Sequence, residues 1–415
     1  MRRIAEQKSL WIVLVALVAM VALIAGCPSQ QETAPPEDVN PPDAEVGEAA
    51  QGGPIKIGGI FATTGPASSL GEPEANTAMM LQEQINADGG INGREIEIVI
   101  RDTKGQETEG LTAVKELIEK EGVVAIVGPS RSGTTMAIIE EIESSEIPLL
   151  SCAAARAITE PVKTWVFNTP QSDEDAVTKI YNYLGDEDIN NVAVITASSG
   201  YGQQGLIQLE ELAPGAGIEI VAKEEFADTD NDMTVQLTKI KNSDAQALIC
   251  WGIGPAPAQI AKQAKQLDIG MPVIMSHGVA NRRFIEGAGE GAEGVILPAG
   301  KLLVANQLPD DDPQKELLLE YASNYEDKYG QPADTFGGHA WDAVMLVVNA
   351  IENNGAEPAQ IREGVENTQG FVGIGGVFNF SADSHYGLSP DAFEMVTIEN
   401  GDWVLIGGEG GDAAE

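Results

Sequence analysis

The stretch that best combines residues able to do chemistry is Val124–Ala137, VAIVGPSRSGTTMA. Its apolar first half predicts a short strand, its Gly-Pro pair a tight turn, and the residues from Ser132 onward a helix. The first N–H groups of such a helix have no partner within it, and they lie at the positive end of the helix dipole. The stretch therefore predicts an anion site that needs neither a metal nor a cofactor.

A phosphate suits this loop poorly. GPSRSGTT has the spacing of a Walker A motif, but Thr134 stands where the lysine that reaches the phosphates is required. The first strand-to-helix turn, GGIFATTGPASSLG, lacks the G-x-G-x-x-G pattern of dinucleotide sites. A single carboxylate is the better candidate for the anion.

Patterns typical of catalysis or metal binding are absent from the sequence. The histidines at 277, 339 and 385 are scattered, and neither HExxH nor G-x-S-x-G occurs. His339, in GGHAWD, is expected to pack within a helix. Cys152 and Cys250 end apolar stretches, where small buried thiols are expected. We therefore predict a binding protein rather than an enzyme, with no cofactor and no metal.

The composition narrows the possible partners. The 415 residues include 64 acidic and 24 basic side chains, which gives a formal net charge of −40. Such a charge argues against binding to nucleic acid or to an anionic membrane through a basic patch. The length allows two domains with cores of their own.

The N-terminal sequence predicts an export signal. Basic residues precede an apolar run from Leu10 to Ala25, and LIAGC at 23–27 resembles a bacterial lipobox, in which the signal is cut before the cysteine. We expect residues 1–26 to be a signal peptide and Cys27 to carry lipid that anchors the exported protein to the membrane, facing the periplasm or cell exterior. An uncleaved N-terminal anchor is the alternative. Residues 27–53, rich in Pro, Glu and Asp, predict a disordered tether.

From Pro54 onward, strand patterns alternate with amphipathic helix patterns, and the series restarts after residues 165–177 with a helix expected at 178–184. This alternation predicts an α/β protein with two doubly wound parallel sheets. Helices are expected at 313–329, 336–352 and 358–367, and strands at 371–381 and 392–407. The last of these contains Asn400-Gly401, which is typical of a hairpin turn.

Several motifs in combination resemble the type I periplasmic binding proteins of ABC importers, in the leucine/isoleucine/valine-binding branch. They are INADGGINGREIEIVIRD, VGPSRSGTTMA, WVFNTPQSD, SSGYGQQG and SHGVANRRFIEGAGEGAEGV. The resemblance implies two Rossmann-like lobes, joined by three hinge crossovers, that close over a ligand. We expect lobe 1 to comprise 54–170 and 300–370, lobe 2 to comprise 171–299 and 371–408, and 409–415 to be a tail.

The resemblance also implies which first-lobe residues bind the ligand. The residues expected to hold a carboxylate at the head of the third helix are Ser132, Gly133 and Thr134. A second ligand-binding segment matches Ala153 to Ala155, but Ala155 occupies the position of a threonine in amino-acid-binding members. Arg131 either places its guanidinium near the ligand or pairs with an acidic neighbour.

The second lobe departs further from the pattern of the family. Tyr201 matches the tyrosine that amino-acid-binding members supply, and Trp251 is the nearest match to a further aromatic residue. His277 stands where those members have the acidic residue that holds the ligand's ammonium group. A buried ammonium without an anionic partner costs several kcal/mol.

These departures favour a small carboxylate without an amine as the ligand. Sequence segments such as LGEPEAN and TFGGHAWDA resemble those of the sub-branch that binds aromatic and other organic acids. A branched-chain or other aliphatic amino acid is the alternative ligand. The implied partner is the permease of an ABC importer, with a sensor that signals to another protein as the alternative role.

Overall fold

The computed structural model describes residues 53–407. Its first sheet is entirely parallel, with strand order β2-β1-β3-β4-β5. The elements of this first lobe are β1 (Ile55–Phe61), α2 (Ser68–Ala87), β2 (Ile96–Asp102), α3 (Glu107–Glu116), β3 (Ala125–Val127), α4 (Ser132–Ser145), β4 (Leu149–Ser151) and β5 (Val166–Asn168).

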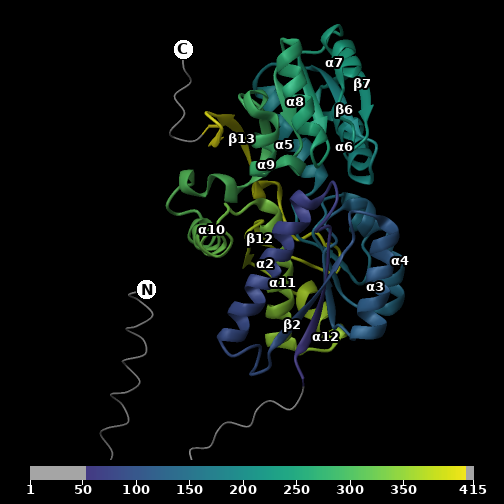
Figure 1. Cartoon of the computed structure of the whole chain (residues 1–415), viewed down its shortest axis with the longest axis vertical. Helices are drawn as coiled ribbons and strands as arrows, with labels where there is room; N and C mark the ends of the chain where they lie inside the picture. The colour runs from purple at the N-terminus through teal and green to yellow at the C-terminus, as the bar shows by residue number, and fades with distance from the viewer. Residues whose placement is uncertain (1–52, 408–415) are drawn as a thin grey trace, which may run out of the picture. The chain divides into compact units, whose positions relative to one another are not determined.

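The second sheet has strand order β14-β13-β10-β9-β8-β6-β7, in which β13 pairs antiparallel with both β10 and β14 and the remaining pairs are parallel. Its lobe contains α5 (Asp173–Asp186), β6 (Asn191–Ala197), α6 (Gly200–Ala216), β7 (Glu219–Phe226), α7 (Thr234–Lys241), β8 (Ala247–Trp251), α8 (Ala256–Leu267), β9 (Val273–Met275), α9 (Arg282–Ala288), β10 (Ile296–Gly300), β13 (Phe393–Glu399) and β14 (Asp402–Leu405). Figure 1 shows α2, α3 and α4 at one end of this body and α6, α7 and α8 at the other.

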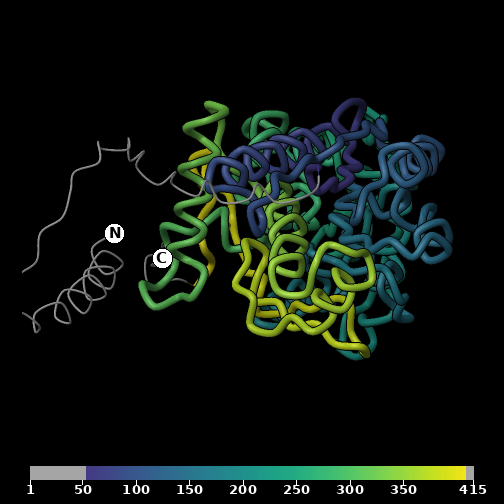
Figure 2. The backbone as a smooth tube through the Cα atoms, turned by 90° about the horizontal axis from the view of Figure 1, so that it is seen from below, coloured from purple at the N-terminus to yellow at the C-terminus, as the bar shows by residue number. Residues whose placement is uncertain are grey.

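Three helices and a small hairpin complete the fold. They are α10 (Lys315–Tyr329), α11 (Thr335–Asn354), α12 (Pro358–Glu366), β11 (Phe371–Val372) and β12 (Val377–Phe378). Helix α11 packs along α2 and α12, so a late segment completes the first lobe (Figure 2). Helix α10 contacts both lobes, because Leu318 joins the core beside the second sheet and the Tyr321 hydroxyl bonds to Thr77 of α2 at 2.8 Å.

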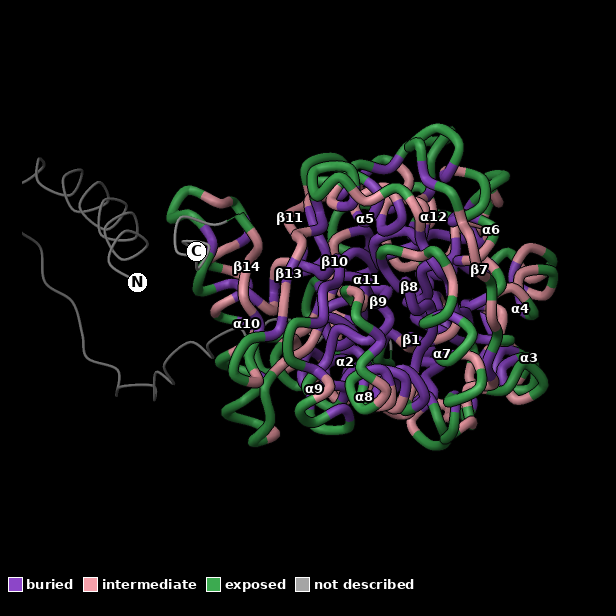
Figure 3. Tube along the Cα trace, turned by 90° about the horizontal axis from the view of Figure 1, so that it is seen from above, coloured by how far each residue is buried: buried purple, intermediate pink, exposed green. Residues whose placement is uncertain are grey.

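Burial explains why these segments form strands and helices. The residues of β3, β4 and β8 are all buried, as expected for parallel strands covered by helices on both faces. Figure 3 shows this burial along β8 and α11. Helix starts are also encoded locally: Ser172 caps α5 by accepting from the N–H of Asp175, and Asp334 caps α11 by accepting from that of Gly337.

Three crossovers join the lobes, and the loop Gly373–Gly376 contacts all of them. Gln171, in the first crossover, donates to the Gly375 carbonyl at 2.7 Å, and Gln314, in the second, donates to the Gly373 carbonyl at 2.8 Å. The loop joins β11 to β12, directly before the third crossover from β12 to β13, and Gly376 packs against Leu388 of that crossover. Asp342 of α11 accepts the N–H groups of Ile374 and Gly375 at 2.6 and 2.7 Å, so the loop is fixed to the first lobe.

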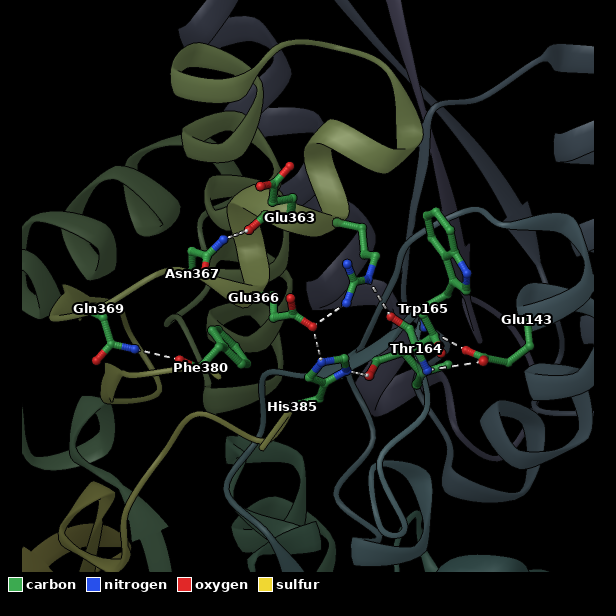
Figure 4. A network of polar contacts seen from close by, with 11 residues as sticks. Glu143, Thr164, Trp165, Glu363, Glu366, Asn367, Gln369, Phe380 and His385 are labelled. Atoms are coloured by element: carbon green, nitrogen blue, oxygen red, sulfur yellow. Dashed lines mark hydrogen bonds and ion pairs between the residues drawn. The ribbon is translucent and has the colours of Figure 1, made fainter. Parts of the chain in front are cut away.

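A buried network holds the segment after β12 against the first lobe. The His385 ring stacks on Phe167 of β5. Its Nδ1 donates to the Val166 carbonyl at 3.0 Å, in the polar network drawn in Figure 4. Its Nε2 lies 3.2 Å from Glu366 of α12. Phe380 packs edge-on against Phe167. Residues 371–408 are expected from the sequence to lie in the second lobe; we propose instead that residues 371–385 belong with the first.

The alternation of strands and helices, the two lobes and their crossovers are as predicted, and so is the hairpin turn at Asn400-Gly401. The expected strand at 371–381 is wrong in detail, because glycines at 373, 375 and 376 turn the chain back between two-residue strands. The predicted signal peptide, the lipidated Cys27, the tether up to 52 and the tail lie outside the described residues. Within 53–407, no helix is both long and apolar enough to cross a membrane.

Candidate functional site

A small cavity lies between the two lobes. Its volume is about 30 Å³, which is room for roughly two water molecules. A ligand larger than this can enter only if the lobes separate. The cavity is lined from the first lobe by Leu70, Ser130, Arg131, Ser132, Cys152, Ala153, Ala154, Pro170, Phe336 and His339, and from the second by Tyr201, Ile253, His277 and Gly278.

The stretch predicted to bind an anion, Val124–Ala137, forms one wall of this cavity and is called the anion loop below. Ser132 is the first residue of α4, and its side chain is buried with no hydrogen-bond partner for Oγ among the described residues. The turn before it requires glycine, since Gly128 has a φ of +89° and a Cβ there would lie 2.1 Å from the Ile60 carbonyl oxygen. The free N–H groups of α4 and the unpaired hydroxyl of Ser132 together suit a carboxylate.

The other first-lobe candidates divide between lining and packing positions. Ala153 lines the cavity, and its N–H donates to Ser151 Oγ at 3.1 Å. Ala155 is fully buried in the core and is not among the lining residues. Gly133 and Thr134 do not line the cavity either: Gly133 faces Gly200 of the second lobe, and the Thr134 methyl packs against Gly110 of α3.

In the second lobe, Tyr201 and His277 meet at the cavity. The Tyr201 hydroxyl lies 3.4 Å from Nδ1 of His277, and both side chains are buried. Trp251 stands behind them, with ring centroids 5.8 Å from those of Tyr201 and His277, and does not line the cavity. Gly205 makes room for the Trp251 indole, because a Cβ there would lie 2.2 Å from its Nε1.

Both histidines at the cavity are neutral at ordinary pH. Burial, with a smaller contribution from the neighbouring His339, lowers the pKa of His277 to about 3. Burial also lowers the pKa of His339 to about 3. None of the described residues that line the cavity has a carboxylate side chain, and Arg131 is the lining residue with a full charge. The cavity is therefore suited to an anion and not to a buried cation.

The guanidinium of Arg131 is already paired, across the two lobes. It contacts the carboxylate of Asp228, which follows β7, at 2.5 Å, and it donates to the Gly105 carbonyl at 3.1 Å. Ser199, beside the start of α6, also bonds to Asp228. Of the two expectations for Arg131, this geometry favours the acidic neighbour, and it places that neighbour in the opposite lobe.

Sequence reasoning missed His339 and Phe336 as cavity residues. Both lie in the first two turns of α11, three positions apart, so they share a face of the helix. The His339 side chain does pack within a helix, as expected, but it also reaches the cavity. The only local signal was the aromatic residue three positions before the histidine.

A buried carboxyl, Glu74 of α2, lies behind the cavity wall. It accepts a short hydrogen bond from Ser130, and its Oε1 has no partner among the described residues. Burial raises the pKa of Glu74 well above its usual range, only partly opposed by the Ser130 bond. Glu74 is therefore neutral well above pH 4.5, and it does not supply the anion that an ammonium would need.

This raised pKa makes a prediction for stability. Above about pH 4.5 the unfolded chain releases the Glu74 proton while the folded chain keeps it, so the free energy of unfolding falls as pH rises, by up to about 1.4 kcal/mol per pH unit. Glu74→Gln cannot titrate and keeps an acceptor for Ser130. We expect the variant to gain stability relative to the wild type between pH 5 and 7 in urea unfolding. The same change at exposed Glu97 is the control, and parallel wild-type and Glu74→Gln profiles would contradict the prediction.

Residues 54–401 match the family model described as periplasmic binding protein. The chain is 25% identical to the leucine-, isoleucine-, valine-, threonine- and alanine-binding protein of Pseudomonas aeruginosa over 74% of this chain and 81% of that one. An extracellular ligand-binding receptor from Rhodopseudomonas palustris HaA2 superposes with a TM-score of 0.80 at 25% identity, over 85% and 100% of the two chains. The substrate-binding protein LivJ of Streptococcus pneumoniae, in complex with isoleucine, gives 0.74 at 27%, over 85% and 99%.

Proposed function

The chain belongs to the type I periplasmic binding proteins, in the leucine/isoleucine/valine-binding family, and from this premise we propose that it binds a small carboxylate without an amine and presents it to an ABC importer. The observation that carries the proposal is the charge pattern of the cavity. An unpaired serine hydroxyl at a helix start faces a second lobe whose lining residues, Tyr201, Ile253, His277 and Gly278, include no carboxylate.

Burying the amine of an amino acid in this cavity would cost free energy. An α-amino acid buries one carboxylate and one ammonium, and each charge needs a partner of its own. Ser132 and the N-terminus of α4 serve the first charge. For the second, the cavity offers neutral imidazoles and a tyrosine hydroxyl, which leaves the ammonium several kcal/mol short of compensation.

An aliphatic amino acid is the second candidate, and the comparisons favour it. LivJ was solved with isoleucine, and the Pseudomonas relative is named for five amino acids. A ligand of this class would have to place its ammonium on backbone carbonyls, or cause Glu74 to release its proton to solvent and pair with it as a carboxylate. Thermal shift of the purified protein against both classes separates the candidates, because a ligand that binds the folded state raises the melting temperature. Shifts with leucine or isoleucine and none with amine-free acids would overturn the proposal.

The anion loop gives a prediction of its own. Ser132→Ala removes a hydrogen bond to a charged group, worth about 1.5–3 kcal/mol, so we expect at least a tenfold loss of affinity for the best acid. Isothermal titration calorimetry measures it. Ser144→Ala, at the exposed end of the same helix, is the matched control and should bind like the wild type. Unchanged affinity in Ser132→Ala would remove the assignment of the loop.

The remaining parts of the proposal rest on sequence. Export and lipid attachment at Cys27 follow from the apolar run and LIAGC, which precede the described residues. In this arrangement the anchored receptor samples solute outside the cytoplasm. Ligand binding then favours the closed arrangement of the lobes, which the permease would recognise.

A further inference from the structure

Two histidines, one from each lobe, line the same cavity. His277 follows β9 in the second lobe, and His339 lies on α11 in the first. Both are nine-tenths or more buried, with exposed fractions of 6% and 4%. They therefore add two imidazoles to a lining whose other polar side chains are those of Ser130, Arg131, Ser132 and Tyr201.

Packing holds each ring in place. The Thr169 hydroxyl donates to the His339 carbonyl at 3.0 Å, and the Phe336 ring meets the His339 ring edge-on at 6.1 Å. His277 is surrounded by the rings of Tyr201, Trp251 and Phe393, with centroids 5.2 to 5.8 Å away. Rings fixed in this way present their nitrogens in defined directions, which is what a specificity site requires.

The hydrogen-bonding capacity of these rings is largely unused. Nδ1 of His339 has no partner among the described residues. The nitrogens of His277 have the Tyr201 hydroxyl as a partner, at 3.4 and 3.5 Å, which is at the long limit of a hydrogen bond. Each neutral imidazole offers one donor and one acceptor. Buried polar atoms in this state cost free energy unless a ligand satisfies them.

We propose that His339 and His277 hold a hydroxyl group of the ligand, so that the ligand is a hydroxy carboxylic acid with its carboxylate at Ser132. A hydroxyl donates one hydrogen bond and accepts others, which matches a pair of neutral imidazoles that each do both. An ammonium or a second carboxylate would bring a charge that neutral rings do not balance. The apolar body of the ligand would contact Leu70, Ile253 and Phe336. This inference rests on the proposed function, since it assumes that a carboxylate occupies the anion loop.

The test compares matched pairs of acids that differ by one hydroxyl. Suitable pairs are benzoate with 3- and 4-hydroxybenzoate, and 4-methylpentanoate with 2-hydroxy-4-methylpentanoate. Calorimetry on the full chain gives the ratio of affinities within each pair, for the wild type, His339→Phe and His339→Gln. Phenylalanine keeps a ring of similar size without its nitrogens, and glutamine restores a donor and an acceptor. Melting of each variant without ligand confirms that it is folded.

We expect one hydroxy acid to bind the wild type at least tenfold more tightly than its parent, because a site with unpaired polar groups rejects the analogue that lacks the hydroxyl. His339→Phe should bring that ratio close to one, and His339→Gln should restore part of the preference. A ratio of one in the wild type, or a ratio that survives His339→Phe, would overturn the inference while leaving the proposed function intact. Binding of amino acids alone would overturn both.

Discussion

Gly202→Ala is expected to destabilise the protein by about 4 kcal/mol or more and to abolish ligand binding, an effect in the extreme tail for single substitutions. Gly202 lies in the first turn of α6, where the helix passes directly over the end of β6. A Cβ at this position would lie 2.0 Å from the carbonyl oxygen of Ala197 and 2.7 Å from its nitrogen. Backbone atoms cannot rotate away as a side chain can, so the helix itself would have to move, and Tyr201 with it.

The first lobe repeats this arrangement and allows a second test. A Cβ on Gly71, in the first turn of α2, would lie 2.3 to 2.5 Å from the backbone of Ala62 at the end of β1. Gly71→Ala should therefore be as damaging as Gly202→Ala. The matched control is Gly215→Ala near the end of α6, where a Cβ meets nothing within 4 Å. Denaturant unfolding measures all three, and a Gly202→Ala protein within 1 kcal/mol of the control would contradict the prediction.

Gly200→Val is expected to lower ligand affinity about 100-fold or more, while the melting temperature of the ligand-free protein changes little. Gly200 begins α6 and faces Gly133 of the first lobe, and a Cβ on it would lie 2.9 Å from the Gly133 Cα. Valine would hold the two helix starts apart in the closed arrangement and would touch nothing new once the lobes separate. A penalty of about 2.7 kcal/mol on the closed state alone is a 100-fold loss.

Calorimetry with the best ligand tests Gly200→Val, and Gly215→Val on the same helix controls for the change in helix propensity. Small-angle scattering adds a direct view of closure, because the wild type should become more compact on ligand addition and Gly200→Val should not. Wild-type affinity in Gly200→Val would show that the contact between Gly133 and Gly200 is not required for binding.

Local sequence was enough to predict the strand and the helix start within Val124–Ala137, because both are encoded in that stretch. The lobes and their sheets followed from alternation over longer stretches. Contacts made by segments distant in sequence were not predictable in the same way. His339 reaches the cavity because α11 returns to the first lobe after the whole second lobe has been formed, and the partner of Arg131 lies 97 positions further along the chain.

The hairpin β11–β12 shows a different limit. The apolar residues of FVGIGGVF predict a continuous strand. The side chain of Asp342, however, accepts hydrogen bonds from the N–H groups of Ile374 and Gly375, which lie 32 and 33 positions further along the chain. The glycines are required there for a spatial reason, since a Cβ on Gly373 would lie 2.3 Å from the Asp342 carboxylate. The apolar pattern that predicts a strand at 371–381 contains no sign of these hydrogen bonds to Asp342, which compete with strand pairing.

The position of Arg131 has a consequence for how mutational data on this protein combine. Its side chain lines the cavity and also joins the lobes through Asp228, so any substitution there disturbs ligand contact and closure at once. Loss of binding in an Arg131 variant is therefore not by itself a sign that the guanidinium touches the ligand. Only the non-additivity of Arg131 and Asp228 variants, measured as a double-mutant cycle, separates the two contributions. If the whole effect of Arg131 vanishes once Asp228 is gone, its role is to hold the lobes together.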